Sequence, residues 1–251
     1  MLDILKVLFI IPFLIYSCYS DIKTRRVSNN VWLVMLAGII FFVMIDFLSG
    51  GLNYLRILMF SVIFIFIFVY ILFQIGTFGG ADAKSLIMMS IILPVYPEIH
   101  VLNYYFPINP PLINIFALGI FSNAVLLTIV VPLGLATFNI IKLGAKIDKP
   151  LYIFIGYKTK ISNLANKHIK LIQYHEELNG KIKSRFKRGG VEVNENILNN
   201  LNNLYKKGLI EEYVWVTPSL PFMIPITIGF FAGILYGDII LELVKFFIFR
   251  I

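Results

Sequence analysis

The sequence contains little cysteine, histidine or charge, and each shortage excludes a class of protein. One cysteine and three histidines occur in 251 residues, so neither a disulfide framework nor a cysteine-cluster zinc site can be built. Charged residues make up 14% of the chain and hydrophobic residues 59%, whereas a soluble globular domain is about 25% charged. The composition excludes an ordinary soluble protein and predicts an integral membrane protein.

The formal net charge of +8 is concentrated in one segment. Residues 142–217 hold 14 of the 22 Lys and Arg residues but only seven of the 14 acidic residues. The rest of the chain is almost neutral. The positive-inside rule explains a basic segment beside apolar spans, so we expect a lipid bilayer as partner and no nucleic acid.

Six apolar stretches predict membrane spans, since a helix needs about 20 residues to cross the hydrocarbon core. They cover residues 4–20, 31–47, 57–75, 81–94, 112–141 and 218–240. The stretch "DFLSGGLNY" predicts a turn between the second and third spans. Pro132 is the expected kink site in the long fifth span. The tail 241–251 either continues the last helix or lies along the interface.

These stretches predict an α-helical polytopic membrane protein of about six transmembrane helices, with a small α/β-type cytoplasmic domain inserted before the last helix. We expect helices one to five in residues 1–141, the soluble domain in 142–217, and the sixth helix with the tail in 218–251. Within the insert, the apolar period of residues 197–205 predicts a helix. "KPLYIFIGYK", residues 149–158, predicts a strand.

The distribution of Lys and Arg predicts the orientation in the cell membrane. The loop after the first span carries Lys23, Arg25 and Arg26, and the 142–217 insert carries 14 basic residues. Both are therefore expected in the cytoplasm. The 95–111 loop has no Lys or Arg and is expected outside, as is the N-terminus.

Two carboxylates are expected at the cytoplasmic membrane face. Asp21 ends the first span and Asp82 begins the fourth, whereas acids such as Asp3 and Asp46 lie at outer span ends where water is available. A charge within the bilayer costs about 2.5–3.5 kcal/mol, so it normally has a functional reason. Two neighbouring carboxyl groups share a proton. One can then activate a water while the other hydrogen-bonds a peptide carbonyl, which is aspartic-protease chemistry.

The surroundings of Asp82 favour access by a peptide. Gly79 and Gly80 allow close approach of a substrate backbone, and Lys84 either assists or binds lipid headgroups. A helix N-cap is the structural alternative for Asp82, and a simple membrane-boundary cluster is the alternative for Asp21 with its basic neighbours. The histidines show no metal spacing, and we expect neither a metal nor a cofactor.

Three segments resemble one protein family. "GGADAK", residues 79–84, resembles the GxGD signature of intramembrane aspartyl proteases, in the form used by type IV prepilin peptidases and archaeal preflagellin peptidases. "SDIKTRRVSN", residues 20–29, resembles the first catalytic segment of that family, and residues 214–229 resemble the archaeal entry into the last helix. Ala81 replaces the second glycine of GxGD, a position at which archaeal members accept a hydrophobic residue. The paired-cysteine zinc motif of many bacterial members is missing.

The resemblance implies a set of site residues and a reaction. Asp21 and Asp82 would form the catalytic pair of an aspartic endopeptidase, in an active-site loop with Gly79, Gly80, Ala81 and Lys84. Substrate or headgroup contacts are expected from Lys23, Arg25 and Arg26. The implied reaction removes a short basic leader from preflagellin (archaellin) or from type IV prepilin-like precursors.

Three other functions stay open at this point. The first is an archaeal prepilin peptidase that acts on pilins rather than archaellins. The second is a proton- or ion-coupled transporter that uses Asp21 and Asp82. The third is a membrane-anchored adaptor whose soluble insert is the working part.

Overall fold

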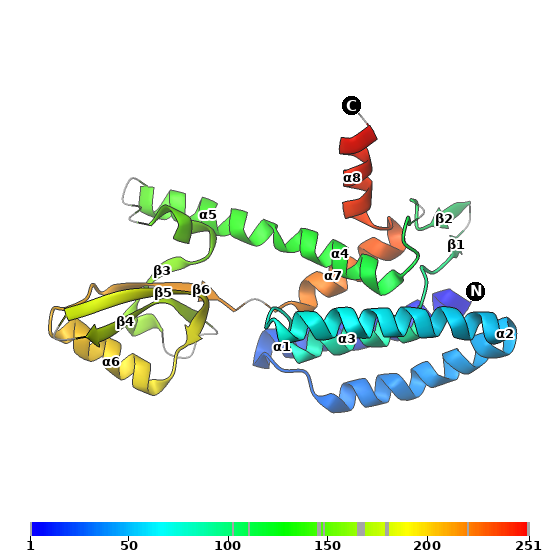
Figure 1. Ribbon diagram of the computed structural model, residues 1–251, viewed down its shortest axis with the longest axis horizontal. Helices are drawn as coiled ribbons and strands as arrows, with labels where there is room; N and C mark the ends of the chain where they lie inside the picture. The colour runs from blue at the N-terminus through cyan, green and yellow to red at the C-terminus, as the bar shows by residue number, and fades with distance from the viewer. Residues whose placement is uncertain are drawn as a thin grey trace. The chain divides into compact units, whose positions relative to one another are not determined.

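The computed structural model describes residues 2–101, 103–109, 111–144, 147, 149–164, 169–178, 181–219 and 221–249. The chain forms two compact units (Figure 1). The helical unit comprises Met1–Thr128 and Pro221–Ile251, and the sheet unit comprises Ile129–Leu220. The sheet unit is therefore an insertion into the helical unit.

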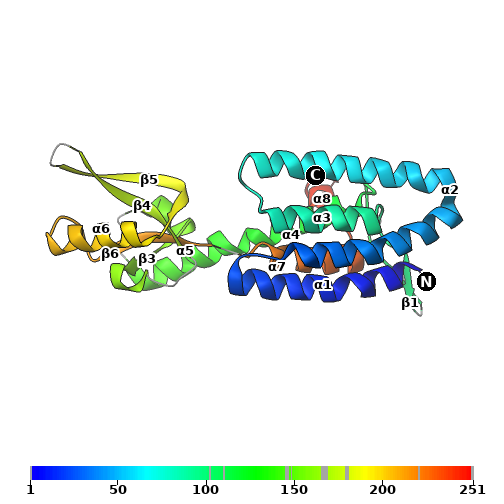
Figure 2. The same ribbon diagram turned by 90° about the horizontal axis from the view of Figure 1, so that it is seen from below.

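The helical unit begins with α1 (Leu2–Thr24), α2 (Asn29–Gln74) and α3 (Gly80–Ile92). At 46 residues, α2 is more than twice the roughly 20 residues of one membrane span. It turns back on itself at Gly51, which has φ 56° and ψ −140° (Figure 2). Because this left-handed conformation suits glycine, the bend falls within the glycine-rich stretch in which the sequence predicts a turn.

The helical unit continues with a short hairpin of β1 (Ile99–Val101) and β2 (Tyr104–Phe106), and then with α4 (Phe116–Thr128), α7 (Met223–Leu235) and α8 (Ile239–Phe249). Helices α4 and α7 approach closely: a Cβ on Gly229 would lie 2.6 Å from the carbonyl oxygen of Ile120. Gly233, further along α7, faces Phe116 at the start of α4. The two helices are therefore antiparallel neighbours. A bend of 64° separates α7 from α8.

A single apolar core joins these helices. Ile10, Met35, Met89 and Phe230 are fully buried within it. Many apolar side chains also point outward, since large hydrophobic residues such as Phe60 are mostly exposed. Helices that are apolar on all sides are typical of a membrane environment.

One buried ion pair corrects an expectation. The Nζ of Lys6 lies 2.7 Å from Oδ2 of Asp46 and 3.1 Å from Oδ1 of Asp3. The exposed fractions of Lys6 and Asp46 are only 5% and 9%. Asp46 is therefore not a water-exposed span end, because the lysine compensates its charge inside the protein.

The sheet unit contains α5 (Val130–Leu143), α6 (Glu195–Lys206) and an antiparallel sheet. The sheet order is β3 (Tyr157–Lys160), β6 (Tyr213–Pro218), β4 (Ile169–Leu178) and β5 (Lys181–Glu192). Val214 and Val216 of β6 pack in a cluster with Leu201 of α6. Trp215 lies between them in sequence and packs with Ile172 and with Ala136 of α5. Because side chains alternate along a strand, α5 and α6 cover opposite faces of the sheet.

The predicted helix of the insert is present as α6, and Gly208 beyond it has φ 68°. The predicted strand at residues 149–158 is wrong over most of its length, since Pro150–Phe154 is a 3-10 helix and β3 starts at Tyr157. Proline is favoured at the first position of a helix, where no amide donor is needed.

The described residues contain three helices that are long and apolar enough to cross a membrane. They are Leu2–Thr24, Asn29–Gln74 and Phe116–Leu143. A fourth span results if the bent pair α7 and α8 counts as one. The prediction of a largely helical membrane protein with a small sheet domain is confirmed in these terms, whereas the count of six spans stays a prediction.

Candidate active site

Asp21 lies in the last turns of α1 and contacts the start of α7. The backbone N–H of Met223, the first residue of α7, donates to Oδ2 of Asp21 over 3.3 Å. The first amides of a helix have no partner within the helix, and the positive end of the helix dipole favours a negative charge. The Met223 amide at the α7 N-terminus therefore orients the Asp21 carboxylate.

Cys18 lies one turn before Asp21 and reinforces this contact. Its Sγ lies 3.0 Å from Oγ1 of Thr227, and it also donates to the carbonyl oxygen of Met223 over 3.3 Å. These bonds join residues more than 200 positions apart in the sequence, so no local pattern could have indicated them. Together they hold the end of α1 against the start of α7.

Asp82 is the third residue of α3 and is 9% exposed. The backbone N–H of Gly79, the N-cap residue, donates to Oδ2 of Asp82 over 3.2 Å. The capping alternative is thus partly realised, although Asp82 caps from inside the helix rather than from the N-cap position. A Cβ on Gly79 would lie 2.9 Å from this same oxygen, so only glycine leaves the carboxylate undisturbed.

The two aspartates lie at the same end of the helical unit. Helix α1 ends at the same end of the unit at which α3 begins (Figure 2). The ring of Phe78, just before α3, lies 5.1 Å from that of Phe222. Since Phe222 precedes the residue that binds Asp21, the loop before Asp82 packs against the start of α7. The structure therefore brings to one end of the helical unit the two segments that carry the carboxylates singled out by the sequence.

Lys84 connects the two segments that resemble the family. Its Nζ donates to Oδ1 of Asn29, the first residue of α2. Gly80 has open space where a Cβ would be, and Ala81 is half-buried. The loop at 79–84 is therefore tied to the 20–29 segment by a side-chain hydrogen bond.

The basic residues after Asp21 have separate environments. The Nζ of Lys23 lies 5.6 Å from the ring centre of Tyr19. Arg25 has φ 57°, and its Nε and Nη1 are buried without a hydrogen-bond partner among the described residues. The backbone carbonyl of Arg26 accepts hydrogen bonds from Ser20 and Thr24. Arg26 thus completes the end of α1 with its backbone, while its side chain is exposed.

No metal site is found within the part of the chain that the structure describes, where no three His, Cys, Asp or Glu side chains gather. His100 stacks edge-on against Tyr105, with ring centres 4.5 Å apart. His168 lies outside the described residues.

Comparison with known proteins gives the class of this protein. Residues 8–133 match the type IV leader peptidase family, and residues 148–239 match the type II C-terminus of archaeal A24 peptidases. The chain belongs to the type IV leader peptidase family. It is therefore a peptidase, as the sequence predicts, and this favours the enzyme over the transporter and adaptor alternatives.

Three similar proteins are all named preflagellin peptidase. A preflagellin peptidase of Methanococcus voltae is 28% identical over 240 residues, which is 92% of this chain and 94% of the relative. A preflagellin peptidase of Methanocaldococcus jannaschii is 27% identical over 238 residues, with 91% and 92% covered. A third, from Methanococcus maripaludis, is 26% identical over 238 residues, with 91% and 94% covered. The likeness extends over nearly the whole length of each chain.

Proposed function

We propose that this protein is an aspartic endopeptidase that removes the leader from preflagellin (archaellin) or from type IV prepilin-like precursors, with Asp21 and Asp82 as its catalytic pair. The observation that carries the proposal is that the two segments bearing these carboxylates meet at the start of α7, through the Met223 amide on Asp21 and the contact of Phe78 with Phe222. The three preflagellin peptidases among its relatives support preflagellin as substrate, ahead of pilins.

The surroundings of the two aspartates support a division of roles. Asp21 is half-buried whereas Asp82 is only 9% exposed, so Asp21 is more accessible to water and we assign it as the general base. It takes a proton from a water whose oxygen attacks the scissile carbonyl carbon. Asp82, protonated, donates a hydrogen bond to the carbonyl oxygen and then passes its proton to the leaving amine.

The loop 79–84 and the basic residues Lys23, Arg25 and Arg26 have supporting roles in this proposal. Gly79 and Gly80 leave space for an extended peptide beside Asp82. Lys84 holds the loop against the start of α2 through Asn29. The three basic side chains bind either the substrate or lipid headgroups at the membrane surface.

The proposal includes a topology of six spans. They are α1, the two arms of α2 on either side of Gly51, α3, α4 with the first turn of α5, and α7. The N-terminus lies outside, whereas the catalytic pair and the soluble domain 142–217 lie in the cytoplasm, which agrees with the positive-inside rule. Cleavage then occurs at the cytoplasmic interface, where water is available.

A cleavage assay tests the catalytic pair. Asp21→Ala and Asp82→Ala are compared with the unaltered protein in detergent, with preflagellin and a prepilin as substrates. We expect each variant to accumulate normally and to lose about 10³-fold or more in cleavage rate, as is usual when a catalytic acid or base is removed. Glu98→Ala, an exposed acid in the 95–111 loop, serves as control and keeps the full rate. Normal cleavage by either aspartate variant would refute the assignment.

A further inference from the structure

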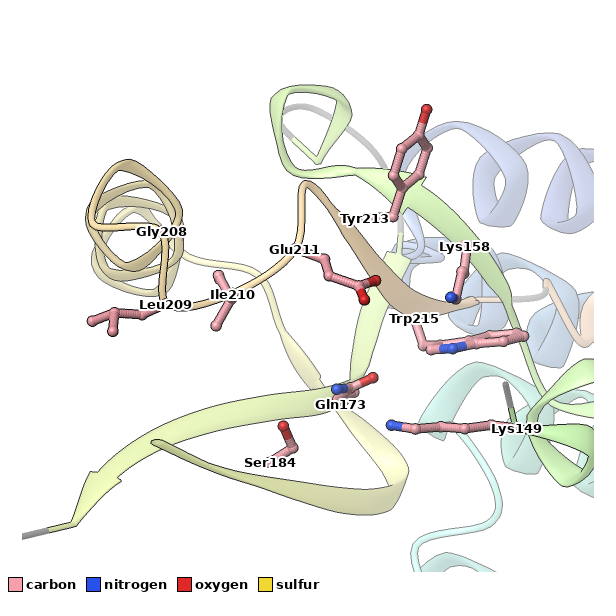
Figure 3. A pocket seen from close by; sticks show the side chains of 10 residues that line it. All are labelled: Lys149, Lys158, Gln173, Ser184, Gly208, Leu209, Ile210, Glu211, Tyr213 and Trp215. Atoms are coloured by element: carbon pink, nitrogen blue, oxygen red, sulfur yellow. The ribbon is translucent and has the colours of Figure 1, made fainter. Parts of the chain in front are cut away.

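A cleft in the sheet unit has no part in the proposed reaction. It holds about 480 Å³ on the face of the sheet that carries Trp215. Its side chains come from β3, β4, β5, β6 and two loops (Figure 3). The lining residues are Lys149, Lys158, Gln173, Ser184, Tyr213, Trp215 and the loop 208–211. All of them belong to one compact unit, so the cleft is formed within that unit.

Trp215 lies at the floor of the cleft and has an unused donor. Its side chain is 1% exposed, and its Nε1 has no hydrogen-bond partner among the described residues. In Figure 3 the indole nitrogen lies on the side of the ring that faces Gln173 and Lys149. Buried donors are nearly always hydrogen-bonded, so an unpaired one calls for an explanation. An acceptor supplied by a ligand would satisfy it.

The charges of the cleft favour a singly charged anion. The ammonium of Lys149 extends into the cleft (Figure 3) and lies 4.9 Å from the ring centre of Tyr152. The ammonium of Lys158 lies 5.8 Å from the ring centre of Trp215. Glu211 lines the opposite wall. The positive charge of Lys149 beside the unused Trp215 donor suits a carboxylate better than a doubly charged phosphate, which Glu211 would repel more strongly.

The remaining lining residues suit a peptide. Gln173 and Ser184 add an amide and a hydroxyl, and Leu209 and Ile210 add apolar surface beside them. We propose that this cleft binds an acidic residue in a peptide segment of another protein. Lys149 pairs with the carboxylate, Trp215 Nε1 and the Gln173 amide donate hydrogen bonds to it, and the apolar pair contacts the neighbouring side chains. The site is independent of leader cleavage and of Asp21 and Asp82.

Tryptophan fluorescence can detect this binding directly. The chain contains two tryptophans, so Trp32→Phe leaves Trp215 as the single reporter in the full-length protein in neutral detergent. The probe is acetyl-Leu-Glu-Leu-amide, with acetyl-Leu-Gln-Leu-amide as its uncharged match. We expect a saturable change with the glutamate peptide and at least about tenfold weaker binding of the glutamine peptide, because charge-assisted hydrogen bonds are the stronger ones. Calorimetric titration of the protein that retains both tryptophans gives the same comparison if Trp32→Phe fails to fold.

A matched pair of variants locates the site. Lys149→Gln should weaken the glutamate peptide about tenfold. Lys142→Gln should leave its affinity unchanged, because Lys142 also lies over an aromatic ring, that of Phe138 at 5.3 Å, but does not line the cleft. Equal affinity for the two peptides, or no effect of Lys149→Gln, would overturn the proposal. So would a response to inorganic phosphate or to vesicles of anionic lipid together with none to the peptide.

Discussion

Gly79 and Gly80 stand side by side at the start of α3, but only Gly79 faces the Asp82 carboxylate. A Cβ on Gly79 would lie 2.9 Å from Oδ2 of Asp82, whereas a Cβ on Gly80 would have no atom within 4 Å. The crowded atom is the end of a side chain, so the carboxylate can move aside without disturbing the helix. In the reaction proposed above, its new position would be wrong for proton transfer.

Gly79→Ala should therefore reduce catalysis more than stability. We expect kcat to fall about tenfold or more, since a misplacement of about 1 Å can cost up to about 10²-fold. The loss of folding stability should stay within about 1 kcal/mol, the usual range for alanine at an N-cap. Rates with preflagellin and a thermal melt measure the two effects. Gly134→Ala in α5, where a Cβ would have no atom within 4 Å, is the control and should keep its kcat within about twofold; equal rates for both variants would contradict this role of Gly79.

The sequence singles out the two aspartates as candidates, but it does not indicate the contacts that hold them. Asp21 and Asp82 stand out because charge is rare beside apolar spans and because the basic residues predict one membrane face for both. The Met223 amide and the Cys18–Thr227 contact depend on how α1 packs against α7. Helix packing between residues about 200 positions apart leaves no local pattern in a sequence.

At the scale of elements, α4 and α7 depend on small residues at their contact. Gly229 faces backbone atoms of Ile120 and Ala124, at 2.6 and 3.0 Å from a built Cβ. Backbone cannot move aside as the end of a side chain can, so a methyl group there must push the helices apart. Small residues allow membrane helices to approach in this way.

Gly229→Ala should therefore lower stability by about 1–3 kcal/mol, the usual cost of overpacking. The control is Gly134→Ala in α5, where a Cβ would have no atom within 4 Å. That change should be neutral or stabilising by up to about 1 kcal/mol, because alanine is the better helix former. Unfolding in detergent, followed by circular dichroism, measures both. Equal stability of the two variants would show that the α4–α7 contact adapts freely.

The elements of the helical unit were easier to predict than those of the sheet unit. Long apolar runs indicate membrane helices whatever packs beside them. The glycine-rich stretch around Gly51 indicates the bend in α2. Strands β4 and β5 are rich in Lys, Arg and Glu, so neither alternation nor β-branched content indicates them. The fifth predicted span is interrupted at Ile129, three residues before Pro132, near the expected kink.

At the scale of the whole molecule, the proposed orientation can be tested with single cysteines. In a Cys18→Ser background, Tyr104→Cys labels the exposed hairpin of the 95–111 loop, and Asn199→Cys labels the exposed side of α6. We expect a membrane-impermeant maleimide to modify the Tyr104→Cys variant in intact cells. It should modify the Asn199→Cys variant only after permeabilisation, because positively charged segments stay in the cytoplasm. The opposite labelling pattern would reverse the topology.

The sheet unit leaves the helical unit after Thr128 and returns at Pro221. Because α4 and α7 run antiparallel with Gly229 opposite Ala124, the end of α4 and the start of α7 are neighbours. A segment that departs and returns at adjacent points can be lengthened, exchanged or lost while the helices around it keep their contacts. In evolutionary terms, the catalytic scaffold and its insert can change at different rates, so new recognition properties can arise without altering the chemistry.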